Sequence, residues 1–222
     1  MTLTFLDLYN ECAGQPWSMF DSDAESVEDL ESSLKISINK AVSFLWNYQP
    51  WSFRQMTHIA RVKIGNNKYL MPDGVISRTV KNNYVKYGVK YDNKNLEIVD
   101  DTDLLDDKSG SPEEFYTKGE YIYLYPTPDA QGILTIDYLS LAFAANSEDE
   151  DVYELTNEDD YIKVPEKYEK MFKNCAISLA MMYAIADEND ENYSGYKKQY
   201  EDALTVLFNY CNDRLQERKI VI

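Results

Sequence analysis

The chain has 222 residues, with 22 Lys and Arg against 39 Asp and Glu, and carries a formal net charge of −17. This charge argues against a protein that wraps nucleic acid or binds an anionic membrane, because both tasks need clustered cations. The length suits one domain or two small ones with a substantial core. Two explanations of the acidity remain open: solubility alone, or a surface that lies near DNA without binding it.

The N-terminal stretch MTLTFLDLYNECAG has no basic leader, so we expect no signal peptide. The longest apolar stretch, AISLAMMYAIA at 176–186, is too short for a membrane span and predicts a buried helix. Three cysteines without a CxxC pair indicate a reducing compartment. We expect Cys12, Cys175 and Cys211 to be structural.

Helical patterns open the chain. A short amphipathic helix is predicted over Leu3–Tyr9. Acidic residues then precede a long helix, and Pro50 ends it. Its apolar residues recur at helical spacing: Val27, Leu30, Leu34, Ile38, Ala41, Val42 and Leu45.

Aromatic residues crowd the stretch LWNYQPWSFRQM at 45–56. A base-stacking platform needs cations beside its rings, and Arg54 and Arg61 are too few. We therefore interpret Trp46, Trp51 and Phe53 as rings that pin the junction between helix and sheet.

Residues 54–161 show strand patterns: HIARVKI, NYVKYGVKY, NLEIV, GEYIYLYP and GILTIDYLSL. In the last run Ile133 and Thr135 fall on one face, and Leu134 and Ile136 on the other. Turn residues such as Asp92-Asn93 separate the runs. Short polar connections predict an antiparallel sheet folded as a small sandwich or barrel.

Two further helices are predicted after Pro165. The first carries a stripe of small residues at Ala176, Ala180 and Ala184, and a short acidic link joins it to the second. The predicted fold class is α+β. Residues 1–53 and 162–222 form a helical bundle, and 54–161 form an inserted antiparallel β domain.

Candidates for catalysis are few. His58 is the single histidine, and no GxSxG, P-loop, GxGxxG or HExxH spacing occurs. The acidic loops lack the glycine and the ligand positions of a calcium-binding loop. Glu113 and Glu114 with Trp46 and Trp51 suggest a carbohydrate-binding or hydrolytic module, but adjacent carboxylates on a strand face opposite sides. We expect no catalytic, cofactor or metal site.

The chain has 19 tyrosines, and Tyr121, Tyr123 and Tyr125 alternate along one predicted strand. Tyrosine is favoured at protein interfaces because it combines a large contact area with a polar tip. Cross-strand packing within the sheet explains the pattern equally well. A contact with another subunit or with a tail protein is the functional hypothesis.

The order of four segments carries a resemblance: WSFRQM after the long helix, YLMPDGVISRTV, SPEEFYTKGEYIYLYPTPDAQGILTIDYLSL and VPEKYEKMFKNCAISLAMMYA. Over roughly residues 40–190 the chain resembles the head-to-tail adaptor, or connector ring, proteins of tailed bacteriophages. It is similar to tail tubular protein A of short-tailed phages and to the ring proteins of crAss-like phages. Met71 before the proline and the long acidic loops depart from the family's pattern.

This resemblance implies a structural virion protein without catalysis or cofactor, made in the host cytoplasm and located at the neck or tail. It implies a ring of about twelve copies between the portal protein and a downstream tail or nozzle protein, away from membranes. DNA passes through without specific binding, and the ring's formal charge, on the order of −200, keeps the channel non-adhesive.

The C-terminal segment RLQERKIVI has a basic turn followed by three apolar residues. Either the segment is a frayed tail, or it docks into the portal by strand addition or by filling an apolar groove, as the resemblance implies. The docking hypothesis concerns Arg214, Leu215, Arg218, Lys219, Ile220, Val221 and Ile222.

The main alternative function is an acidic regulatory protein, such as a DNA mimic that occupies a nucleic-acid-binding protein. Such a protein predicts a monomer or dimer with carboxylates spaced like phosphates on one face.

Overall fold

The computed structural model describes residues 2–15, 26–76, 78–81, 84–100, 108–185 and 188–217. The chain divides into two compact units, one of residues 1–53 and 142–222 and the other of residues 54–141. We call them the helical unit and the β unit. Helices come from both chain ends and antiparallel sheets from the middle, so the α+β prediction is confirmed.

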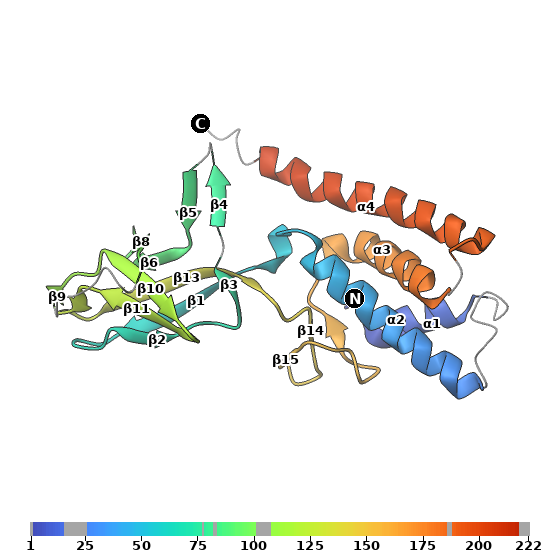
Figure 1. The fold of residues 1–222 in the computed structure, drawn as a ribbon, viewed down its shortest axis with the longest axis horizontal. Helices are drawn as coiled ribbons and strands as arrows, with labels where there is room; N and C mark the ends of the chain where they lie inside the picture. Colours follow the sequence, from blue (N-terminus) through green and yellow to red (C-terminus); the bar gives the residue numbers. More distant parts are fainter. Residues whose placement is uncertain are drawn as a thin grey trace. The chain divides into compact units, whose positions relative to one another are not determined.

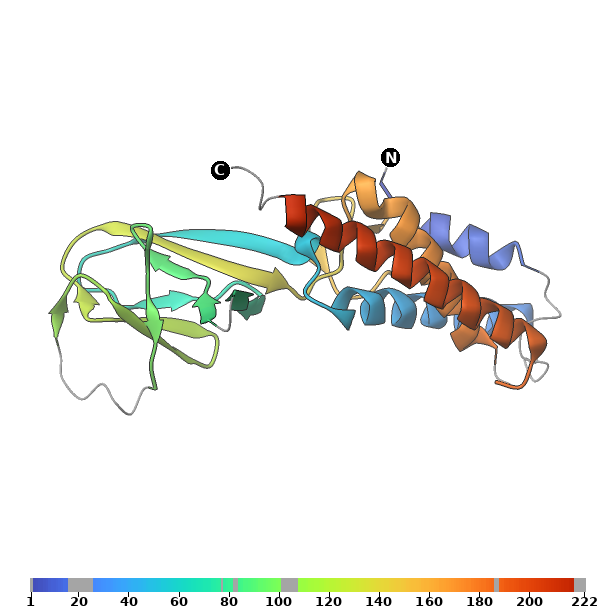
Figure 2. The same ribbon diagram turned by 90° about the horizontal axis from the view of Figure 1, so that it is seen from above.

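The described part of the helical unit contains four α-helices: α1 (Phe5–Ala13), α2 (Val27–Tyr48), α3 (Glu166–Ala184) and α4 (Glu191–Glu217). Helix α3 packs against both α2 and α4, and α1 lies against α2 and α3. Helices α2 and α4 run in the same direction and antiparallel to α3 (Figures 1 and 2). The stripe of small residues on α3 is buried, which permits this close packing on two sides.

Local sequence signals set the ends of α2. Ser26 has extended backbone and its hydroxyl accepts a hydrogen bond from the amide of Asp29 at 3.1 Å, as expected of a helix cap. At the other end Gln49 is extended, because Pro50 disfavours helical backbone in the residue before it.

Trp46, Trp51 and Phe53 are buried in the core of the helical unit. The Trp51 ring stacks on Phe53 with centroids 5.6 Å apart, and its indole N–H donates to the carbonyl of Leu45 at 2.7 Å. Phe53 in turn packs against Tyr168 of α3 at 5.4 Å. The rings are a core anchor, and a stacking platform in solvent is excluded at this site.

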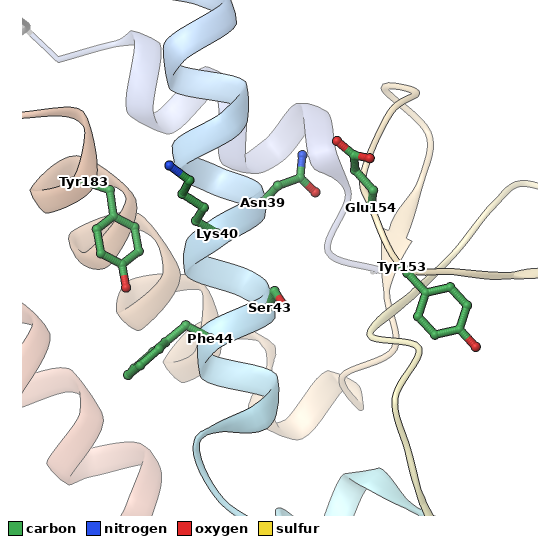
Figure 3. A pocket seen from close by; sticks show the side chains of 7 residues that line it. All are labelled: Asn39, Lys40, Ser43, Phe44, Tyr153, Glu154 and Tyr183. Carbon is green, nitrogen blue, oxygen red and sulfur yellow. The ribbon is translucent and has the colours of Figure 1, made fainter. Parts of the chain in front are cut away.

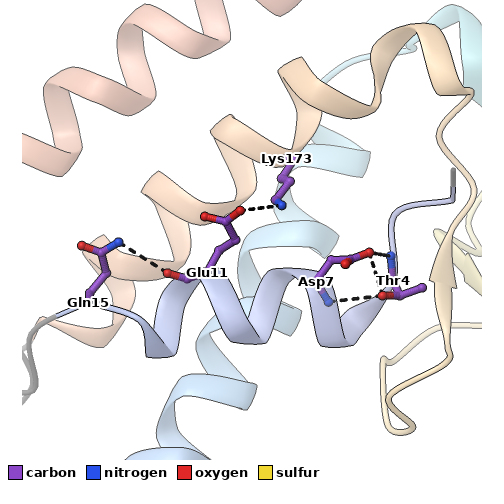
Figure 4. A network of polar contacts seen from close by, with 5 residues as sticks. All are labelled: Thr4, Asp7, Glu11, Gln15 and Lys173. Carbon is purple, nitrogen blue, oxygen red and sulfur yellow. Dashed lines mark hydrogen bonds and ion pairs between the residues drawn. The ribbon is translucent and has the colours of Figure 1, made fainter.

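Helix α1 is held by polar contacts at its start and along its side (Figure 4). Thr4 and Asp7 form a capping box, each side chain accepting from the other residue's backbone amide. The hydrogen bond from Thr4 lowers the pKa of Asp7. Glu11 forms an ion pair with Lys173 of α3 at 2.8 Å. The side-chain amide of Gln15 donates a hydrogen bond to the backbone carbonyl of Glu11.

Residues 142–161 belong to the helical unit, whereas the sequence pattern placed them in the β domain. Here β14 (Ala144–Ala145) pairs with β15 (Asp151–Val152) and β16 (Tyr161–Ile162). These strands are too short for a core of their own, so Phe143 and Leu155 join the helical core. The side chain of Asn39 on α2 also exchanges two hydrogen bonds with the Leu155 backbone, at 2.7 and 3.0 Å.

The β unit is a sandwich of two main sheets around one core. The first has the order β1-β13-β6-β7, with β3 also on β13, and the second has the order β2-β11-β10-β8. Its strands are β1 (Gln55–Val62), β2 (Lys68–Leu70), β3 (Gly74–Ile76), β4 (Arg78–Lys81), β5 (Tyr84–Tyr87), β6 (Val89–Tyr91), β7 (Lys94–Asn95), β8 (Glu97–Ile98), β9 (Ser109–Gly110), β10 (Glu114–Lys118), β11 (Tyr121–Tyr125), β12 (Thr127–Pro128) and β13 (Gly132–Ser140).

The predicted alternation along β13 is confirmed. Leu134 and Ile136 are fully buried between the sheets, whereas Ile133 is 51% exposed on the outer face. The predicted turn at Asp92-Asn93 joins β6 and β7 with positive φ at both residues, which suits a two-residue hairpin. Most pairs are antiparallel as expected, but the short pairs β10–β8 and β12–β9 are parallel.

Candidate assembly surfaces

Three tyrosines line the outer face of β11. Tyr121, Tyr123 and Tyr125 are half-buried, while Ile122 and Leu124 between them are fully buried in the sandwich core. The predicted alternation is therefore confirmed, and we call Tyr121, Tyr123 and Tyr125 the tyrosine face. All three point away from the core, where another protein can reach them.

Side chains on the neighbouring strands β10 and β2 pack against the rings of the tyrosine face. Tyr116 on β10 lies directly opposite Tyr123, and the two rings stack with centroids 4.8 Å apart at an angle of 6°. On the other side, the Lys68 ammonium of β2 sits 3.8 Å from the centre of the Tyr121 ring. Cross-strand packing is thus present, and the three tyrosines remain partly exposed beside it. The contact role itself stays a prediction.

The C-terminal segment lies mostly outside the described residues. Arg214 and Leu215 fall in the last turns of α4, where only the backbone is described. Arg218, Lys219, Ile220, Val221 and Ile222 lie outside the described residues. Portal docking by this segment therefore remains a hypothesis.

A face that the sequence analysis missed lies on α2 and α3. Ile36, Phe44, Tyr48 and Tyr183 are each between 42% and 52% exposed, and Lys40 stands among them. We call these five residues the aromatic face. Phe44 and Tyr48 pack on each other with ring centroids 5.7 Å apart. Four exposed large apolar side chains together are typical of a contact surface.

A shallow hollow of about 720 Å³ runs beside this face (Figure 3). Lys40 and Phe44 point to the side of α2 where Tyr183 lies, and Glu154 lies on the other side of the helix. Lys40 has no ion-pair partner among the described residues. The hollow is open to solvent and mixes apolar and polar walls, so it resembles a docking surface more than a small-molecule site.

A second hollow, of about 470 Å³, is formed by α1, α3 and α4. Asp202 and Val206 of α4 line it together with Glu11 of α1 and Ile177 of α3. Val206 is 55% exposed. We call these four residues the acidic face, because its two carboxylates stand beside exposed apolar carbon.

The negative charge is concentrated in one unit. The helical unit has 11 Lys and Arg against 26 Asp and Glu, a net of −15, whereas the β unit has 11 against 13, a net of −2. Within the helical unit the charge is again uneven, because residues 32–53 contain two Lys and no Asp or Glu. The aromatic face on α2 falls in this acid-free stretch.

The described residues offer little for catalysis or metal binding. They contain no group of three or more His, Cys, Asp or Glu side chains that could hold a metal ion. His58 is exposed on β1, and Glu113 is paired with Lys94 at 2.8 Å, away from its neighbour Glu114. Burial raises the pKa of the Cys12 and Cys175 thiols to about 12, so neither is an activated nucleophile.

A partial signal for the aromatic face is present in the sequence. Ile36, Lys40, Phe44 and Tyr48 recur every four residues, which places them on one ridge of a helix. The buried stripe of the same helix is stronger and obscures this second stripe. Tyr183 could not be added from sequence, because only the packing of α3 on α2 brings it near.

Among the described residues, no helix has the length and apolar character needed to cross a membrane. Comparison with curated proteins found no match. The profile of the SU10 adaptor protein family, by contrast, matches residues 5–219, which include both units of the fold. The chain belongs to the SU10 adaptor protein family and is a structural protein of bacteriophage virions, an adaptor that associates with other head-and-tail proteins.

Proposed function

We propose that this protein is a head-to-tail adaptor that forms a ring of about twelve copies between the portal and the tail and extends the DNA channel. The observation that carries the proposal is the match to an adaptor family over residues 5–219. In this proposal the ring is similar to those formed by tail tubular protein A of short-tailed phages and by the ring proteins of crAss-like phages. The protein acts by binding other proteins, without catalysis or cofactor, and its place is the virion neck after synthesis in the host cytoplasm.

The charge distribution supports a role beside DNA. A helical unit with net charge −15 repels the phosphate backbone over about 10 Å at 0.1 M salt. Nonspecific affinity for DNA comes from the release of counterions by bound cations. An acidic surface releases none, so DNA can slide past it. A DNA mimic would use the same charge to occupy a DNA-binding protein, but the family match gives that alternative no support.

The C-terminal segment 214–222 docks into the portal, in this proposal. Its three terminal residues are β-branched and apolar, which suits strand addition or an apolar groove. Deletion of 214–222 retains every described core residue of α4, among them Leu207 and Cys211, so we expect the helical unit to fold. Loss of portal binding with an unchanged unfolding midpoint supports the docking role, and unchanged portal binding contradicts it.

The tyrosine face contacts the downstream tail protein or a neighbouring subunit. Tyr121→Ser with Tyr125→Ser removes two half-buried rings of the outer face and keeps the stacked Tyr123 and the buried Ile122 and Leu124, so the sandwich stays folded. The control is Ile59→Ser, which removes an exposed apolar side chain from the other sheet of the β unit. Weaker binding of the tail protein or of a neighbouring subunit by the double variant alone supports the assignment, and equal binding of both partners by the two variants refutes it.

The main experiment mixes the purified chain with its cognate portal and follows the product by sedimentation and electron microscopy. The adaptor role predicts a larger complex with an added ring that has the rotational symmetry of the portal. A chain that remains unbound at micromolar concentrations of both proteins contradicts the proposal.

A further inference from the structure

Two faces of the helical unit complement each other in charge and in spacing. We infer that the aromatic face of one copy binds the acidic face of a neighbouring copy, so that the two faces form the lateral contact of the ring. The inference rests on the proposed ring, and it assigns the contact to named residues of α2, α3 and α4.

The aromatic face supplies a cation beside exposed rings. Lys40 is exposed and has no ion-pair partner among the described residues, while Phe44 is 45% and Tyr183 is 42% exposed. No acidic residue occurs between Ser32 and Pro72, so this ridge differs from the rest of a strongly acidic unit. A second copy of the chain offers many acidic partners for it.

The acidic face supplies a carboxylate beside an apolar group. Asp202 and Val206 of α4 both line the second hollow. Glu11, at the edge of that hollow, is already paired with Lys173 at 2.8 Å. Asp202 has no such partner among the described residues, which leaves it available to a cation from outside.

The spacing of the two pairs matches. Lys40 and Phe44 are four residues apart on α2, and Asp202 and Val206 are four residues apart on α4. Residues at this spacing lie one above the other on the same side of a helix. When the two helices pack in parallel, Lys40 therefore meets Asp202 and Phe44 meets Val206 in one register.

A ring provides this parallel packing. Helices α2 and α4 of one copy run in the same direction, and the small rotation between ring neighbours keeps the neighbour's α4 close to that direction (Figures 1 and 2). A ring contact also needs two different faces on each subunit, because a face that binds the same face of another subunit produces a closed dimer. The aromatic and acidic faces are different, as this geometry requires.

The first test is cross-linking of the portal-bound protein with a short bismaleimide. Native cysteines among the described residues are all buried, so introduced ones react selectively. Chains with Phe44→Cys alone or Val206→Cys alone stay uncross-linked, a mixture of the two gives dimers, and the double variant gives a ladder of oligomers. A Phe44→Cys chain that cross-links to itself or to the portal, or a double variant that gives no ladder, overturns the inference.

The second test reverses the charges. Lys40→Glu and Asp202→Lys each weaken assembly at least about tenfold, and their combination restores it, because the pair is re-formed with opposite polarity. The control Lys170→Glu changes the net charge equally at an exposed position of α3 and leaves assembly unchanged. Both test positions are on the surface, so the unfolding midpoints stay at the wild-type value.

The outcomes separate this inference from the proposed function. A wild-type ring that forms while charge reversal has no effect overturns the lateral contact and leaves the adaptor role intact. Failure of the wild-type chain to form a ring on its portal overturns the proposed ring and the contact with it. A single charge reversal that weakens assembly without rescue in the double variant also overturns the pairing of Lys40 with Asp202.

Discussion

Asp160 is buried at 1% exposure and organises the start of α1. Its carboxylate accepts hydrogen bonds from the backbone amides of Thr156 at 2.7 Å and Asn157 at 2.8 Å, and from both of their side chains. Its backbone carbonyl accepts a hydrogen bond from the Phe5 amide at 2.8 Å. This amide lies in the first turn of α1, where the helix itself provides no acceptor. Asp160→Ala removes the carboxylate that holds this loop in shape.

The expected cost follows from the two amides that lose a charged acceptor. A hydrogen bond to a charged group contributes about 1.5–3 kcal/mol, and both bonds are part-buried, so the variant should lose about 3 kcal/mol of unfolding free energy. With a urea slope of about 2–3 kcal/mol per molar, the midpoint falls by about 1 M. All three tryptophans belong to the helical unit, so their fluorescence reports the unfolding of this unit.

The control is Asp159→Ala, which removes the adjacent and exposed carboxylate. An exposed substitution of this kind changes stability by less than about 0.5 kcal/mol. If Asp160→Ala has the same urea midpoint as Asp159→Ala, the assigned role of the buried carboxylate is wrong.

Three further predictions concern pH, glycine and cysteine. Burial alone raises the pKa of Asp160, but the hydrogen bonds from Asn157 and Thr156 outweigh it and the pKa is lowered. The stabilisation is therefore complete above the unfolded value of about 3.9 and is lost as pH falls through the folded value, so wild type and Asp160→Ala should converge in acid unfolding curves. Gly74→Ala places a methyl group 2.5 Å from the Leu139 carbonyl and should cost about 1–3 kcal/mol, whereas Gly195→Ala, in open space on α4, should stabilise by about 0.5–1 kcal/mol in thermal unfolding. Burial raises the pKa of Cys12 to about 12, so a maleimide at pH 8 should label this thiol only after urea is added; rapid labelling of the folded protein would contradict the assigned burial.

The helices and the main strands were predictable from sequence because their signals are local. Pro50 and the periodic apolar residues gave α2 to within a few residues, and period-two alternation gave the buried face of β13. The tyrosine face followed from the same alternation on β11. In each case the spacing of a few adjacent residues decided the outcome.

The boundary of the inserted domain could not be predicted, because it depends on long-range packing. Residues 142–161 look like strands in sequence, yet Leu155 is bound to Asn39 of α2, more than a hundred positions earlier. The aromatic face depends in the same way on Tyr183 lying beside α2. A local sequence pattern does not determine which surface a short strand or an exposed aromatic ring packs against.

The most direct measurement is cryo-electron microscopy of the neck of intact phage particles that contain this chain. The account predicts a closed ring of about twelve copies below the portal, with the acidic helical unit around the channel and α4 of each subunit against α2 of the next. Particles whose neck lacks this chain, or in which it is present as isolated monomers or dimers away from the channel, would contradict the account.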